Sequence, residues 1–291
     1  MVMTFFLHRN TYYAAFFLVF SNILSACSST QFIYTFVDRY IQDEIEYFID
    51  LNEEDKVLLS QKVSEMVSWH RTSMLPSYAN YLDEIAKKLE EVYDEKVLVK
   101  IALAKGRLLI EQTVHGLTPY ASKFLVRYQT SEDIKFIEKK MKKRRQERLE
   151  EFSKSNETRY EDRVDRLTSN FERFFGTLSD EQLILLKAHA QATLDDEITR
   201  FENRTMRQKI FIKFLYTQPK ESELTSYLNK LLIRGHLLTN PSYEAFSEVS
   251  LKRFETLLVK MISNSTSNQR KIMIRKLRSY ANDFKVVSEK I

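Results

Sequence analysis

Apolar residues recur at intervals of three or four along almost the whole chain, as in Leu251, Phe254, Leu257 and Leu258. That spacing places them on one face of an α-helix, and no stretch of strict alternation is long enough to predict a sheet. Only four Gly and four Pro interrupt the 291 residues, too few for the many turns of a β protein. The sequence therefore predicts an all-α fold, an elongated multi-helix bundle of about ten helices.

Helix starts are marked by the capping-box pattern, a short polar residue followed three positions later by an acid or amide. The four pairs are Asn52 with Asp55, Thr130 with Asp133, Ser179 with Gln182, and Thr266 with Gln269. Their separations follow no fixed period, which argues against a solenoid. We expect Gly and Pro to separate helices, for example at Pro76 and at residues 116–119.

A strongly basic segment covers residues 135–150, with eight cations and three acids around a thin apolar stripe. So narrow a stripe suits a helix that touches a single neighbour. Together with residues 160–175 it predicts a projecting antiparallel helical hairpin whose tip lies near residues 153–158. No change of composition marks a second domain, so residues 27–291 are expected to form one helical domain.

The N-terminus has the pattern of a secretory signal. Residues 1–9 contain one cation, Arg9, and residues 10–26 are uncharged with an apolar centre. The uncharged stretch is shorter than the ~20 residues that cross a bilayer, and no basic cluster follows it. We predict that residues 1–26 are a cleaved signal peptide and not a membrane span.

The signal ends in Leu24, Ser25, Ala26 and Cys27, which resembles the lipobox of bacterial lipoproteins. The resemblance implies cleavage before Cys27, a diacylglycerol thioether on its sulfur and an acyl chain such as palmitate on its amine. Three chains would hold the protein on the membrane, because each buried CH₂ contributes roughly 0.8 kcal/mol. Ser28, which stands where Asp would retain the protein in the inner membrane, implies an outer-membrane location facing the periplasm. The alternative is an ordinary cysteine at a plain cleavage site.

Two short motifs carry a wider resemblance: Trp69, His70 and Arg71, followed by Leu75, Pro76, Tyr78 and Ala79. In these motifs the chain resembles a family of gammaproteobacterial lipoproteins catalogued as a domain of unknown function. The likeness extends to a closing pattern of Gln269, Arg270, Tyr280, Asp283 and Phe284. It implies the lipid anchor and no particular activity.

The first motif also supplies the candidate binding residues Trp69, His70, Arg71 and Tyr78. An aromatic floor with a cation and an imidazole could hold an anionic or planar group through cation–π and bidentate contacts. The structural interpretation, which we favour, is that His70 or Arg71 satisfies the last carbonyls of a helix beside a core Trp.

A second candidate is the basic patch Lys139, Lys140, Lys142, Lys143, Arg144, Arg145 and Arg148. We expect no nucleic acid there, because a secreted protein rarely meets it and the cations surround the helix without interleaved aromatics. The patch is interpreted either as a solvated helix or as a site for anionic lipid head groups or an acidic partner.

The opening of the mature chain is rich in aromatic residues, some on each side of a helix, including Phe32, Tyr34, Phe36, Tyr40, Tyr47 and Phe48. A helix that is apolar on several sides is expected to be buried in the bundle. The alternative is that it lies against the bilayer beside its anchor, with tyrosines at the interface.

No signature of catalysis or metal binding is present. The chain has no Gly-rich phosphate loop, no Gly-x-Ser-x-Gly elbow and no two histidines four residues apart. We therefore predict no enzyme activity, no metal and no cofactor.

The leading functional prediction is a non-enzymatic lipoprotein that binds a protein partner or an envelope component. One alternative is a periplasmic chaperone that works without ATP, because Leu178, Ser179 and Gln182 resemble the Leu-Thr-x-x-Gln motifs of such proteins. The same three residues also fit any capped helix that follows a leucine. The other alternative is an envelope enzyme with a dispersed site.

Overall fold

The structure is a computed structural model that describes residues 29–91 and 94–290. Within these ranges it consists of helices without a strand, so the all-α prediction is confirmed. None of the described helices has both the length and the hydropathy to cross a bilayer. The predicted signal peptide and the lipobox residues Leu24, Ser25, Ala26 and Cys27 lie outside the described residues.

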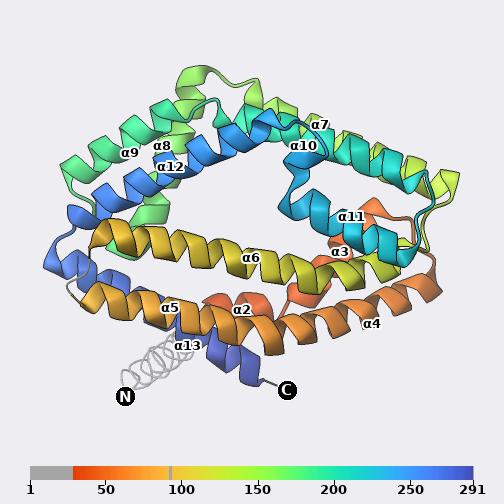
Figure 1. Cartoon of the computed structure of the whole chain (residues 1–291), viewed down its shortest axis with the longest axis horizontal. Helices are drawn as coiled ribbons and strands as arrows, with labels where there is room; N and C mark the ends of the chain where they lie inside the picture. The colour runs from red at the N-terminus through yellow and green to blue at the C-terminus, as the bar shows by residue number, and fades with distance from the viewer. Residues whose placement is uncertain (1–28, 92–93, 291) are drawn as a thin grey trace, which may run out of the picture.

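The helices follow one another through short turns (Figure 1). Their bounds are α2 (Ser29–Tyr34), α3 (Val37–Phe48), α4 (Glu53–Trp69), α5 (Leu75–Glu90), α6 (Glu95–Leu125), α7 (Ser131–Phe152), α8 (Asn156–Phe175), α9 (Asp180–Ala192), α10 (Asp196–Leu215), α11 (Glu221–Ile233), α12 (Ser242–Ser263) and α13 (Ser267–Glu289). A π-helical turn, His70–Met74, joins α4 to α5, and a short 3-10 turn, Gly235–Leu237, follows α11.

The buried apolar residues form two separate cores. The α4 core draws on α4, α7, α10, α11 and the C-terminal end of α6, with Leu59 and Leu215 almost fully buried. The α5 core draws on α5, α8, α9, α12, α13 and the N-terminal part of α6, with Leu186 and Met261 at its centre. The two sets of helices occupy opposite ends of the long axis, and α6 runs through both (Figure 1).

The second element that runs through both cores is the rod formed by α4 and α5. The rod does not break at Pro76, because the π-helical turn His70–Met74 carries the chain from one helix into the other. Proline lacks an N–H and its ring clashes with the carbonyl four residues earlier, and a wider turn accommodates both defects. Pro76 lies in the first turn of α5, as expected for a proline that starts a helix, but the residues before it stay helical.

Helix α6 likewise continues through Gly116 and Pro119, where we expected a break. Pro119 cannot donate to the carbonyl of His115, and the hydroxyl of Thr118 donates to that carbonyl instead, at 3.3 Å. Gly116 is needed because the Trp69 ring lies directly on it: a Cβ there would stand 1.8 Å from a ring carbon. Tertiary packing of the rod on α6 thus explains residues that look like helix breakers.

The expected projecting hairpin is also wrong. Helix α7 packs on α3 and α10, whereas α8 packs on α9 and α13. The two helices diverge from the turn at residues 153–155 (Figure 1). The reason is that Ile134 and Ile137 of α7 belong to the α4 core, and Phe171 and Phe175 of α8 belong to the α5 core.

Three of the four capping boxes are confirmed with both reciprocal hydrogen bonds, at Thr130, Ser179 and Thr266. At Asn52 the cap runs one way: its side chain accepts from the backbone of Asp55 at 2.8 Å. The Asp55 carboxylate accepts from Arg127 at 3.0 Å. The resemblance of Leu178, Ser179 and Gln182 to a chaperone motif is thus accounted for locally by a helix cap.

Candidate functional site

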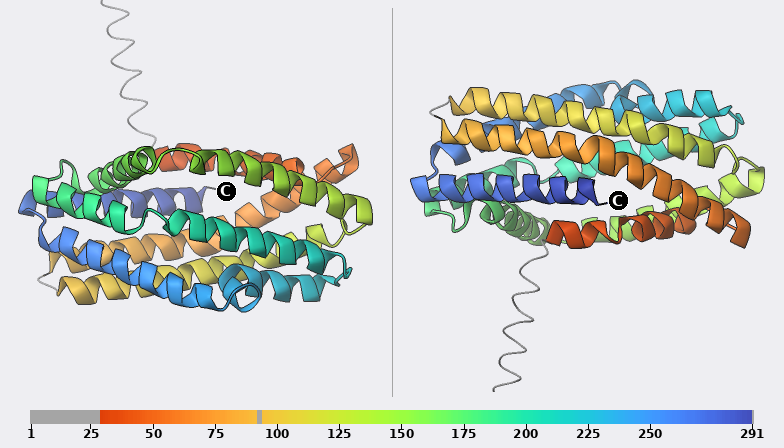
Figure 2. Two further views of the ribbon diagram at one scale, coloured as in Figure 1. Left: turned by 90° about the horizontal axis from the view of Figure 1, so that it is seen from above. Right: turned by 90° about the horizontal axis from the view of Figure 1, so that it is seen from below.

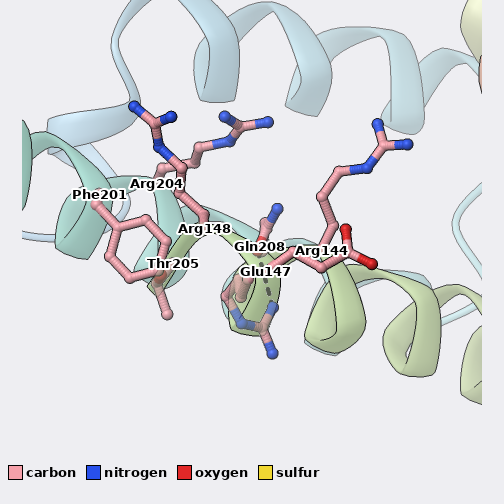
Figure 3. Close-up of a pocket in the computed structure, with 8 residues that line it drawn as sticks. Arg144, Glu147, Arg148, Phe201, Arg204, Thr205 and Gln208 are labelled. Carbon is pink, nitrogen blue, oxygen red and sulfur yellow. Dashed lines mark hydrogen bonds between the residues drawn. The ribbon is translucent and has the colours of Figure 1, made fainter. Parts of the chain in front are cut away.

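A polar cavity lies between α7 and α10, with a volume of about 340 Å³ (Figure 3). Its lining residues are Arg144, Arg145, Glu147, Arg148, Phe201, Arg204, Thr205 and Gln208. We call this site the arginine cleft. Among the described lining residues four are arginines and one, Glu147, is an acid, so the cleft carries a positive charge.

Helical spacing explains why these residues meet. On α7, Arg144 and Arg148 are four residues apart, and on α10 Phe201, Arg204 and Gln208 follow at intervals of three and four. Residues at such intervals lie above one another on one helix face. Because α7 packs on α10, the two faces meet and their charges are brought together.

Arg144 is held at one end of the cleft by α3. It donates to the Glu44 carboxylate at 2.6 Å, and its guanidinium lies 4.3 Å from the centre of the Tyr47 ring. The hydrogen bond from Arg144 to Glu44 raises the pKa of this arginine above its usual value. Cation–π contact and ion pairing therefore fix the position of this charge before any ligand arrives.

A second arginine of the cleft, Arg145, has a neutral partner. Arg145 donates to the amide oxygen of Gln208 at 2.8 Å, which leaves its charge unneutralised by that bond. Figure 3 shows Arg144, Arg148 and Arg204 extending to the same side of the two helices. The buried hydroxyl of Thr205 has no hydrogen-bond partner among the described residues. Such an arrangement suits an anion with several acceptor oxygens.

The structure divides the predicted basic patch into separate environments. Lys139, Lys142 and Lys143 are exposed and do not line the cleft. Lys140 lies 4.8 Å from the centre of the Tyr47 ring. Arg144, Arg145 and Arg148 line the cleft. The sequence does not reveal the contribution of α10. Its cleft residues stand at helical intervals, but no feature of the sequence indicates that α10 packs on α7.

The four candidate binding residues of the first motif do not form one site. Trp69 packs on Gly116 and lies 6.5 Å from Tyr120, between ring centres, whereas His70 faces the other way. His70 Nδ1 lies 2.9 Å from the Tyr34 hydroxyl, and its Nε2 lies 3.4 Å from that of Tyr78. Both ring nitrogens therefore have partners within the protein.

This histidine–tyrosine cluster joins three helices. The Tyr78 hydroxyl makes a short hydrogen bond with Thr113 of α6, and Tyr34 belongs to α2. Burial lowers the pKa of His70 and raises that of Tyr34, so both groups stay neutral near pH 7. The hydrogen bonds within the cluster suit a structural role, the interpretation that the sequence favoured.

Arg71 satisfies a C-terminal carbonyl, that of α13. Its guanidinium donates to the carbonyl of Lys290, directly after α13, at 3.2 Å. Helix α4 ends at Trp69, and the chain passes directly into the π-helical turn that contains His70 and Arg71.

Among the described residues, no group of three or more His, Cys, Asp or Glu side chains is placed to hold a metal ion. The arginine cleft is the candidate functional site, and the chemistry that its charges suit is the binding of anionic groups.

The sequence model of one family, described as "Family of unknown function (DUF6279)", matches residues 47–244, more than half of the chain. Neither the curated proteins nor the solved structures contain a match to this chain. The matched range includes the Trp69-His70-Arg71 motif and both helices of the arginine cleft, and it ends before the closing pattern at Gln269. The resemblance to a family of unknown function is confirmed; its lipoprotein character stays a prediction.

Proposed function

We propose that this chain, which belongs to the family of unknown function DUF6279, is a lipid-anchored protein of the bacterial envelope that binds anionic groups. The anchor would be the acylated Cys27, at the periplasmic side of the outer membrane. The binding site would be the arginine cleft, and the protein would act by binding, without catalysis. Its target would be an acidic partner or an anionic envelope component.

The observation that carries this proposal is the meeting of four arginines from α7 and α10 around one cavity with a single acid. Like charges repel, so such a cluster lowers the stability of the free protein unless an anion neutralises it. Burial of apolar residues elsewhere on both helices supplies the stability that holds the charges together. Lipobox residues Leu24, Ser25, Ala26 and Cys27 support the anchor.

Titration with pyrophosphate at low ionic strength tests the binding site. We expect the wild-type protein to bind, and the double variant Arg148→Ala/Arg204→Ala to bind at least tenfold more weakly. The estimate follows because each hydrogen bond to a charged group contributes about 1.5 kcal/mol or more, and about 1.4 kcal/mol is a factor of ten. Calorimetry gives the two dissociation constants.

Lys142→Ala/Lys143→Ala is the matched control, because it removes two charges from the same helix outside the cleft. We expect it to retain most of the affinity. Equal weakening in both double variants would show that general attraction, not the cleft, binds the anion. Mass spectrometry of the protein purified from membranes tests the anchor separately, since an unmodified Cys27 would contradict it.

A further inference from the structure

Four large apolar side chains near the start of the mature chain are exposed to solvent. Phe32 is 61% exposed, Ile33 67%, Phe36 55% and Tyr40 66%. In the described part of the chain, no other stretch of nine residues exposes as many large apolar side chains. We call these four residues the aromatic ridge. Their exposure contradicts the expectation that this segment is buried on all sides.

The ridge is a single line on one side of α2 and α3. The two helices are nearly continuous, because the N–H of Phe36 donates to the Ile33 carbonyl and the N–H of Tyr40 donates to that of Phe36. Phe32 and Phe36 pack edge to face, with ring centres 5.1 Å apart. The opposite side packs on the α4 core through Val37 and other apolar residues.

The position of α2 is fixed by polar contacts with the body. Gln31 donates to the Asp283 carboxylate at 3.0 Å, and Asp283 is 4% exposed. On the next turn, the Tyr34 hydroxyl bonds to His70. Helices α2 and α3 lie along one long edge of the molecule (Figure 2). The ridge therefore keeps a constant orientation relative to the whole body.

The proposed acylation site is very close to this edge. Only Ser28 separates Cys27 from the first residue of α2, Ser29. An extended chain spans at most ~3.6 Å per residue, so Cys27 lies within ~7 Å of Ser29. The ridge starts at Phe32, less than one helical turn further along. A bilayer that holds the acyl chains must therefore come within reach of the ridge.

Charge varies along the same edge in a matching way. Among residues 32–40 the exposed charged side chain is Arg39, which pairs with Asp43 at 3.0 Å. Beyond Tyr40 the exposed side turns acidic, with Asp43, Glu46 and Asp50. Aromatic and aliphatic side chains enter the head-group boundary of a membrane, and carboxylates stay in water. The part of the edge nearest the anchor is therefore the part suited to lipid.

From these contacts we infer that the aromatic ridge inserts into the bilayer interface beside the acylated Cys27. The protein then rests lengthwise on the membrane along the α2–α3 edge and does not swing freely on its tether. This inference rests on the proposed acylation. The lipid surface is the one occupant proposed for the aromatic ridge. Contact between the ridges of two copies of the chain is the alternative that the test can reveal.

An environment-sensitive label on the ridge tests the inference in the acylated, full-length mature protein. The sequence has a single cysteine, whose sulfur is blocked once acylated, so Phe36→Cys or Tyr40→Cys supplies the reactive thiol. A nitrobenzoxadiazole label is attached, and the protein is reconstituted into phosphatidylethanolamine–phosphatidylglycerol vesicles. Ile184→Cys on α9, where the native side chain is 64% exposed, is the matched control site.

We expect the ridge labels to shift to the blue, to brighten at least ~2-fold and to be quenched by head-group spin labels, as for a helix lying in the interface. The label at position 184 should report water. Ridge labels that report water in a protein whose acylation is verified by mass would overturn the inference while leaving the anchor intact. A blue shift without vesicles that grows with protein concentration would also overturn it, in favour of a second copy.

Discussion

Two helix junctions, one in each core region, use polar side chains in opposite ways. Where α9 meets α13, the amides of Gln182 and Gln269 donate to each other's oxygens at 3.2 and 2.8 Å. The same two oxygens accept the backbone N–H groups of Ser179 and Thr266, which joins two capping boxes in one buried network. Where α7 meets α10, arginines face one another across an open cavity.

The difference shows how to tell a structural polar cluster from a binding one. A buried polar group that has partners inside the protein fixes the fold, because removing one partner leaves the other unsatisfied. Like charges in contact with water repel each other and do not stabilise a junction. They stay close together only when other contacts between the two helices hold the helices in place. The α9–α13 junction is accordingly structural, and the α7–α10 junction is available to an anion.

Gln182→Ala should have the largest effect on stability. It breaks the amide pair, so the Gln269 amide nitrogen, at a site that is 6% exposed, keeps only its bond to the Thr177 carbonyl, and the N–H of Ser179 loses its acceptor. We expect the free energy of unfolding to fall by about 3 kcal/mol. Chemical denaturation measures the change. Glu181→Ala, at the exposed neighbour, should lower it by no more than about 0.5 kcal/mol, and a similar loss in both variants would contradict the assigned role of the buried pair.

Gly116→Ala tests how the two core regions are joined where the rod crosses α6. The added Cβ would overlap the Trp69 ring, so we expect a loss of about 2 kcal/mol in unfolding free energy. In the matched control, Gly106→Ala, the nearest atom is the Tyr81 hydroxyl at 3.4 Å, an ordinary contact. That variant should gain up to about 1 kcal/mol from helix propensity. Changes of the same sign would show that the Trp69 contact does not matter.

Acidification should weaken the fold by a smaller amount. Burial lowers the pKa of both His70 and His189, and Arg163 and Arg253 lower that of His189 further. The unfolded chain then takes up protons first, so the stabilisation is complete above the unfolded pKa of about 6.5 and is lost as pH falls toward the folded pKa values. Urea denaturation from pH 7.5 to 5 should show this decline.

His189→Gln should make the pH profile of unfolding shallower over that range, because it removes one of the two histidines whose pKa is lowered by burial. An identical slope in this variant would rule out His189 as a contributor. At pH 7.5 both histidines are neutral, so a difference in unfolding free energy between the variant and the wild type at that pH measures lost packing and not titration.

Arg148→Ala/Arg204→Ala should have the smallest effect on stability. Exposed substitutions usually change it by less than about 0.5 kcal/mol, and relief of repulsion acts in the stabilising direction. Thermal unfolding without ligand measures it. A loss comparable to that of Gln182→Ala would mean that the arginines hold the junction, and the contrast between the two junctions would fail.

Much of the local structure was predictable from the sequence, because it depends on neighbours in the chain. Apolar spacing predicted helices, and short polar residues at Thr130, Ser179 and Thr266 predicted where helices begin. The errors arose where a distant contact overrides local preference. Helix α6 continues through Gly116 and Pro119, where the Trp69 ring of the distant rod packs on Gly116 and the Thr118 hydroxyl bonds the carbonyl that Pro119 leaves free.

Only the α7 side of the arginine cleft was predictable from the sequence, because the α10 side depends on contacts between distant residues. The cations of α7 stand together in the sequence, whereas Arg204 and Gln208 come from a helix some sixty residues later, placed beside α7 by packing alone. The sequence by itself determined the helical class, the caps and the charge of each helix, since these follow from residues within one or two turns. Only the tertiary structure decided which faces meet, which amides pair and which aromatics stay exposed, because burial depends on residues far apart in the chain.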